Sequence, residues 1–248
     1  LLLAAVLGNA CYTSNPELLE RTATEEQATA EPKTNGKRTA VVVELFTAQG
    51  CASCGEANAF VAKLAERADV LPLTFSVDYW DYLGWADTFA RPEFAARQRA
   101  YVAKLAVREP YTPQVVVDGR AQAAGQQTGR VEALIREAQR VVRDPPEVKF
   151  INERRVDVGF GHAPRGGTDV WLVRFDPRER DVEIKSGDNR GQTIAHRNVV
   201  RQVERLGGWR GRPTAYRLPR PAEEGLSSVL LVQGRESGRI LAVGRPDA

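Results

Sequence analysis

The stretch VVVELFTAQGCASC, residues 41–54, joins a run of apolar residues to a pair of cysteines. The valine-rich run over residues 40–46 predicts a buried strand, and residues 57–68 carry apolar side chains at helical spacing. The chain is therefore expected to bring Cys51 and Cys54 to the start of a helix directly after a strand. Two cysteines at this spacing and in this place are typical of a redox site that alternates between a dithiol and a disulfide.

Regular patterns continue to residue 142. Strands are predicted at residues 70–77, 114–117 and 120–124, and helices at residues 93–107 and 128–142. Asp118-Gly119, between the last two strands, is a strong signal for a tight hairpin. The order β-α-β-α-β-β-α is that of the thioredoxin core, so the fold predicted for residues 39–144 is an α/β thioredoxin-like domain.

Asp144-Pro145-Pro146 predicts a domain boundary, because proline cannot continue a helix. Beyond it, short segments of alternating apolar and polar residues are separated by turn residues. They predict a mostly antiparallel β domain over residues 147–248, arranged as a sandwich or an open barrel. Residues 199–206 are amphipathic, and we interpret them as a short helix inside this domain.

Residues 1–10 are apolar and small, as at the end of a secretory signal peptide without its basic start. We interpret them as a signal-peptide remnant, and residues 11–38, which lack an apolar period, as a disordered tether. Cys11 follows an imperfect lipoprotein motif. Lipidation of Cys11 with anchoring to a membrane, ordinary secretion with cleavage near Ala10, and a fragment of a cytosolic protein are all open interpretations. Both export routes lead to the periplasm or the extracellular space, where disulfides form.

The two cysteines are expected to have different roles. Cys51 is predicted at the helix N-cap, where unpaired backbone N–H groups and the helix dipole stabilise a thiolate, so it is the predicted nucleophile. Cys54 lies one turn further and is more shielded, so it is the predicted resolving cysteine. Thr112 and Pro113 precede the third strand. In thioredoxin-like proteins the proline at this place is cis and lies against the cysteine pair, so both residues are expected to shape the substrate groove.

Glu44 interrupts the first apolar strand, where an unpaired carboxylate would be costly. In thioredoxins a buried acid on the corresponding strand assists proton transfer at the inner cysteine. By this resemblance, Glu44 is a candidate base for Cys54. The alternative is a glutamate at a sheet edge whose carboxylate reaches solvent.

Four segments carry a further resemblance: VVELFT (42–47), QGCASC (49–54), VDYWDYLGW (77–85) and YTPQ (111–114). Together they resemble a bacterial family of exported thioredoxin-like proteins that is known only as a domain of unknown function. The resemblance extends over most of residues 39–245 and implies a thioredoxin-like fold with an appended β domain, without a substrate. Gly55 and Glu56 follow Cys54 where such proteins usually have a proline. This departure bears on the reduction potential and not on the redox pair itself.

Residues 78–85 are expected to leave the carboxyl end of the second strand, the edge at which α/β sheets place their sites. Tyr79, Trp80 and Trp85 are therefore candidate substrate-binding residues beside the dithiol, where they would grip a peptide or another extended ligand. The alternative is that these aromatic side chains cover the core or dock the β domain.

Composition argues against several classes of function. A net charge of +3 gives no electrostatic reason for a nucleic acid partner. His162 and His196 have no metal-ligand spacing, so neither a metal nor another cofactor is expected. Two functions remain. One is an exported thiol–disulfide oxidoreductase that acts on a thiol or disulfide protein partner, and the other is a non-catalytic binding module with a static disulfide. No oligomeric state is predicted.

Overall fold

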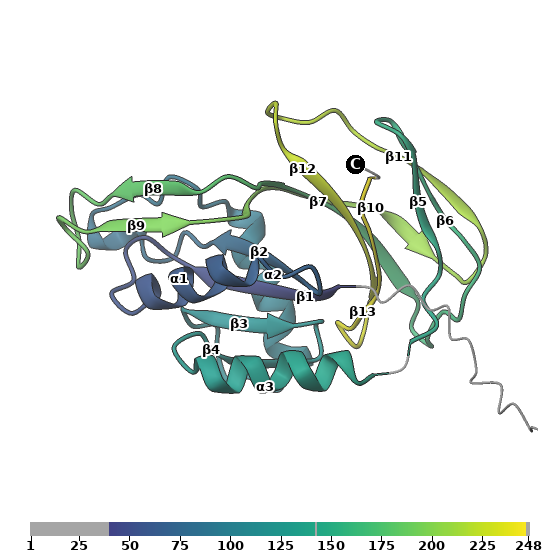
Figure 1. Ribbon diagram of the computed structural model, residues 1–248, viewed down its shortest axis with the longest axis horizontal. Coiled ribbons are helices and arrows are strands. Elements are labelled where there is room, and N and C mark those ends of the chain that lie inside the picture. The colour runs from purple at the N-terminus through teal and green to yellow at the C-terminus, as the bar shows by residue number, and fades with distance from the viewer. Residues whose placement is uncertain (1–39, 142, 247–248) are drawn as a thin grey trace, which may run out of the picture. The chain divides into compact units, whose positions relative to one another are not determined.

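The computed structural model describes residues 40–141 and 143–246 (Figure 1). The signal-peptide remnant, the tether and Cys11, which the sequence places within residues 1–38, lie outside the described residues. In the described part of the chain, no helix is both long enough and apolar enough to cross a membrane.

Helices and strands alternate in the first half of the described chain, and strands alone follow. The helices are α1 (Cys54–Leu64), α2 (Pro92–Lys104) and α3 (Thr128–Gln139), with one turn of 3-10 helix, η1 (Asp81–Leu83). The strands of this half are β1 (Val41–Thr47), β2 (Val70–Ser76), β3 (Gln114–Val117) and β4 (Ala121–Ala124). The later strands are β5 (Val148–Asn152), β6 (Arg155–Val158), β7 (Thr168–Asp176), β8 (Arg180–Glu183), β9 (Thr193–His196), β10 (Val199–Trp209), β11 (Thr214–Arg217), β12 (Ser227–Gly234) and β13 (Ile240–Gly244). The order β1-α1-β2-α2-β3-β4-α3 matches the predicted order of elements.

A sheet of eight strands forms the centre of the fold, in the order β13-β12-β7-β10-β2-β1-β3-β4 (Figure 1). β2 pairs in parallel with both β1 and β10, whereas the other neighbouring pairs are antiparallel. The chain thus has a mixed α/β fold built on a large, mostly antiparallel sheet.

β1 is buried on both faces, which explains its uninterrupted apolar run. Val41, Val43 and Leu45 pack in a cluster with side chains of α1 and α3. Val42 and Phe46 pack on the opposite face, in a cluster that contains side chains of α2 and both cysteines. The strand that leads to Cys51 is therefore covered by helices on both sides.

The predicted short helix at residues 199–206 is wrong, because these residues belong to β10, which pairs with β7. The register of this pairing shifts between Val200 and Gln202 and again between Arg205 and Gly207. An extra residue at each shift interrupts the two-residue alternation of a strand. The apolar residues of β10 consequently recur at intervals of three and four, as they do on a helix.

The β-rich part is not a separate sheet, although the sequence predicts a domain of its own over residues 147–248. β7, β10, β12 and β13 extend the sheet that contains β1–β4, and the described residues cluster as one compact unit. The junction lies between β2 and β10, where the Thr74 N–H donates to the Asn198 carbonyl (3.0 Å) and Asn198 Nδ2 donates to the Pro72 carbonyl (2.8 Å). This contact covers an edge of β2 that would otherwise be unpaired. The prolines at residues 145–146 therefore mark a change of chain direction rather than an independent unit.

A second, three-stranded sheet packs against part of the large sheet. The sheet β11-β6-β5 packs on the distal strands of the large sheet through an apolar cluster that includes Val158, Leu172, Trp209 and Leu230. β8 and β9 form a separate hairpin, which lies beside α1 (Figure 1). That hairpin is the part of the β-rich half that reaches the cysteines.

Candidate functional site

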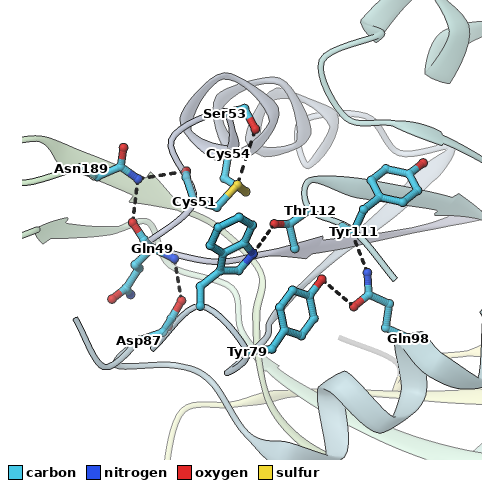
Figure 2. The surroundings of a disulfide bond; sticks show 11 residues. Gln49, Cys51, Ser53, Cys54, Tyr79, Asp87, Gln98, Tyr111, Thr112 and Asn189 are labelled. Atoms are coloured by element: carbon cyan, nitrogen blue, oxygen red, sulfur yellow. Dashed lines mark hydrogen bonds between the residues drawn. A yellow bond between two sulfur atoms is a disulfide. The ribbon is translucent and has the colours of Figure 1, made fainter. Parts of the chain in front are cut away.

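Cys51 and Cys54 form a disulfide in the turn between β1 and α1, with 5.4 Å between their Cα atoms (Figure 2). The Cys54 N–H donates to the Cys51 carbonyl (3.0 Å) and closes this turn. Cys51 Sγ also lies 3.6 Å from Ser53 Oγ. α1 begins at Cys54 with Ser53 as its N-cap, so the expectation that Cys51 occupies the N-cap is wrong. Cys51 therefore precedes the helix, and Ala52 and Ser53 lie between it and Cys54.

The disulfide is almost completely covered. Cys51 is 2% exposed and Cys54 is 0% exposed, although Ala52 and Ser53 between them are exposed. Tyr79 and Trp80 are half-buried and pack against the apolar cluster that contains both cysteines. Trp80 Nε1 donates to Thr112 Oγ1 (2.7 Å) and thereby ties the loop after β2 to the loop before β3. The two cysteines therefore offer very little exposed surface to a reaction partner.

The Thr112–Pro113 peptide bond is cis, as the resemblance to thioredoxin-like proteins implies. Pro113 is buried at the start of β3. Gly125 passes so close that a Cβ atom there would lie 2.7 Å from Ala57 Cβ and 3.0 Å from Pro113 Cβ. Gly125 therefore lies close to both Pro113 and Ala57 of α1, where the Cβ atom of any other residue would not fit.

Glu44 is fully buried, so the alternative of an edge carboxylate that reaches solvent is wrong. Arg97 Nε donates to Glu44 Oε1 (2.6 Å), and the Tyr101 hydroxyl donates to Oε2. Gln233 of β12 completes the network through hydrogen bonds with Arg97 and Tyr101. The hydrogen-bond partners of Glu44 thus lie on α2, and no bond joins its carboxylate to Cys54.

Asp87 is the buried acid that contacts the cysteine turn. Its Oδ2 accepts a hydrogen bond from the Gln49 N–H (2.7 Å), and its Oδ1 accepts one from the Phe89 N–H (2.9 Å). Burial raises the pKa of Asp87 to about 6, although both N–H groups act in the opposite direction by stabilising the carboxylate. Asp87 therefore holds the backbone of Gln49, which lies two residues before Cys51, through a hydrogen bond to its carboxylate.

The aromatic residues after β2 divide into internal and exposed ones. Trp85 Nε1 donates to Gln49 Oε1 (2.8 Å), and the Tyr79 hydroxyl donates to Gln98 Oε1 (3.1 Å). Tyr82 is 78% exposed and stacks on Trp80, with 6.4 Å between ring centroids. Tyr79 and Trp85 therefore hold the loop on the core through hydrogen bonds, and Trp80 packs against the cysteine cluster, whereas Tyr82 lies at the surface.

Asn189 is a site residue that the sequence analysis missed. It lies in the loop between β8 and β9, and its Nδ2 donates to the carbonyls of Gln49 (2.7 Å) and Cys51 (2.9 Å), as Figure 2 shows. Asn189 lies about 140 residues from Gln49 in the sequence, within a turn-like segment. No local sequence pattern could therefore point to this contact.

Replacing Trp80 with alanine is expected to accelerate reduction of the disulfide. The change removes the side chain that packs against the cysteine cluster and its bond to Thr112. Because thiol exchange depends on access to the sulfur, we expect reduction by dithiothreitol to become at least about threefold faster. The rate is measured by trapping free thiols at successive times.

Tyr82→Ala is the matched control, since Tyr82 is exposed and its replacement should leave the rate unchanged. Equal rates for Trp80→Ala and the unmodified protein would show that Trp80 does not limit access.

Comparison with known proteins relates the chain to one protein family and to two solved structures. The profile of a family described as proteins of unknown function (DUF1223) matches residues 42–233. A crystal structure of a protein from Agrobacterium tumefaciens has 32% sequence identity and a TM-score of 0.63, over 82% of this chain and 90% of that chain. HBP35 of Porphyromonas gingivalis has 13% identity and a TM-score of 0.52, over 84% of this chain and 74% of that chain, which is a likeness of fold alone. No curated protein matches the chain significantly.

Proposed function

The chain belongs to the family of proteins of unknown function DUF1223, and we propose that it is an exported thiol–disulfide oxidoreductase with a thioredoxin-like core. The observation that carries this proposal is the disulfide between Cys51 and Cys54 in the turn before α1. The element order β1-α1-β2-α2-β3-β4-α3, with the cysteines between the first strand and the first helix, supports the same assignment.

The proposed reaction moves two electrons between the cysteine pair and a protein partner. In the reduced protein, the Cys51 thiolate attacks a disulfide of the partner, forms a mixed disulfide and expels one partner sulfur as a thiolate. The Cys54 thiolate then attacks Cys51 Sγ, which releases the second partner thiolate and leaves the Cys51–Cys54 disulfide. The thiol protons pass to solvent and are taken up by the released thiolates. The reverse sequence oxidises a partner dithiol.

The residues around the disulfide have proposed roles in receiving the partner. Trp80 moves aside to expose Cys51, and this movement breaks its bond to Thr112. Thr112 and Pro113 then offer backbone to an extended segment of the partner beside Cys51. Tyr79 and Trp85 act indirectly, because their polar atoms hold the loop that carries Trp80.

An exported location suits the proposed chemistry, because disulfides form and persist in oxidising compartments. Cys11 and residues 1–10 lie outside the described residues, and the proposed export signal and lipid anchor rest on their sequence. The mass of the mature N-terminus separates the two routes, since a lipidated Cys11 adds acyl chains and cleavage after Ala10 does not.

A second candidate function is a binding module with a static disulfide. The specific observation in its favour is the burial of both cysteines, at 2% and 0% exposure. A buried disulfide that no thiol reaches stabilises the fold without reacting.

The reduction potential of the pair decides between the two candidates. The protein is equilibrated with glutathione buffers, and the fraction of free Cys51 and Cys54 thiols is measured by mass after alkylation. An exchanging pair is expected to equilibrate at a potential above about −300 mV and to reduce insulin disulfides. Cys51→Ser is the control and should be inactive with insulin. A pair that stays oxidised in all glutathione buffers, in a protein inactive with insulin, would establish the static disulfide instead.

A further inference from the structure

The loop between β8 and β9 forms a rigid support against the cysteine turn. Within the loop, the Ile184 N–H donates to the Gln192 carbonyl (2.9 Å) and the Gly191 N–H donates to the Ile184 carbonyl (2.7 Å). Ser186 Oγ donates to the Gly84 carbonyl (2.5 Å), and Ile184 is fully buried. The loop is therefore anchored both to itself and to the segment after β2, so the position of Asn189 within it is well defined.

The side chain of Asn189 is oriented by the two carbonyls that it meets. Asn189 is 1% exposed, and its Nδ2 donates to both the Gln49 and the Cys51 carbonyls. Its Oδ1 is buried without a hydrogen-bond partner among the described residues. Only the amide nitrogen is able to donate, and the opposite orientation would set Oδ1 against two carbonyl oxygens. An unsatisfied buried oxygen is costly. The two hydrogen bonds to the cysteine turn are therefore the interactions that offset the burial of the Asn189 side chain.

The two carbonyls lie on either side of Gly50. Glycine has the greatest backbone freedom of all residues, and Gly50 is the residue through which Cys51 would most easily change position. The Cys51 carbonyl also accepts the Cys54 N–H, which closes the turn. By binding the carbonyls before and after Gly50, Asn189 restricts the backbone at the glycine that precedes Cys51.

We propose that Asn189 is a positioning residue that holds Cys51 within bonding distance of Cys54 and thereby stabilises the disulfide relative to the dithiol. A restricted turn raises the effective concentration of one thiol at the other, and this favours disulfide formation. The role in catalysis rests on the proposed oxidoreductase function, whereas the effect on the cysteine pair does not. The β-rich half of the chain thus supplies part of the redox site.

The first experiment measures the glutathione equilibrium of the full-length Asn189→Ala variant. Loss of both hydrogen bonds is expected to shift the equilibrium constant about tenfold toward the dithiol, which corresponds to about 30 mV for a two-electron couple. Asn189→Asp keeps the shape but not the donor and should shift it in the same direction. Arg190→Ala is the matched control, because Arg190 is the exposed neighbour of Asn189, and its equilibrium should stay within about twofold of the unmodified protein. An unchanged equilibrium in Asn189→Ala would overturn the proposal.

A second measurement tests whether Asn189 has a purely structural role. It also applies if the Cys51–Cys54 pair does not equilibrate with glutathione. Asn189→Ala is introduced into the disulfide-bonded protein and into the Cys51→Ser/Cys54→Ser double variant, and unfolding by urea is compared. Because coupling between two sites is reciprocal, Asn189→Ala should lower the folding equilibrium constant about tenfold more when the disulfide is present. Equal losses in both backgrounds would show that Asn189 only supports the fold. If the shift occurs but the unmodified protein does not reduce insulin, the positioning role stands and the oxidoreductase function fails.

Discussion

Replacing Glu44 with leucine is expected to lower the free energy of unfolding by about 3–5 kcal/mol, because it leaves a buried guanidinium without its anion. The side chain of Arg97 is only 6% exposed and lies 5.6 Å from the centre of the Trp171 ring. It cannot recover the lost interaction from water. The Tyr101 hydroxyl loses its acceptor at the same time. Urea unfolding at pH 7 measures the change.

The double variant Glu44→Leu/Arg97→Met is the control for this effect. Replacing both charges with apolar side chains removes the unpaired ion, and buried ion pairs replaced in this way are often nearly neutral in stability. We therefore expect the double variant to be more stable than Glu44→Leu alone. A single variant as stable as the unmodified protein would show that the pair between β1 and α2 does not support the fold.

Glu44→Gln tests whether Glu44 also serves the cysteines. The amide keeps most of the shape and removes the charge. Since the carboxylate bonds to α2 and not to Cys54, the pH dependence of disulfide exchange should be unchanged in the folded variant. A shifted pH profile would restore Glu44 as the proton partner that the sequence suggested.

Replacing Cys54 with serine is expected to convert exchange into covalent capture. Cys51 is still able to attack a partner disulfide, but no second thiolate is present to release the mixed disulfide. Release then depends on an external thiol and loses the effective molarity of an intramolecular attack, which reaches about 10⁵ M in well-oriented cases. Turnover with insulin at millimolar thiol should fall by at least about a hundredfold.

Mass spectrometry under non-reducing conditions detects the captured partner. The Cys54→Ser protein should gain the mass of one partner chain, and dithiothreitol should remove it. Cys51→Ser is the control, because it lacks the attacking sulfur and should form no such adduct. An adduct on Cys51→Ser and none on Cys54→Ser would reverse the roles proposed for the two cysteines.

Several parts of the fold were predictable from local sequence. The valine-rich run of β1, the helical spacing in α1 and the Asp118-Gly119 hairpin each follow from patterns within a few residues, and all three elements are present. Residues 199–206 of β10 carry a helix-like pattern, because two register shifts hide the alternation of a strand. The prolines at residues 145–146 predict the end of a domain, because no local pattern reveals that β10 returns to pair with β2.

The amino-acid sequence by itself determined the spacing of Cys51 and Cys54 and their place between a buried strand and a helix, because covalent spacing and side-chain periodicity are local properties. Tertiary structure decided the partners of these residues. Asn189 reaches the cysteine turn across about 140 residues, Asp87 rather than Glu44 contacts it, and Glu44 pairs with Arg97 on α2. Such contacts arise only when distant segments pack together, since a buried polar group takes whichever partner the fold brings within hydrogen-bond distance.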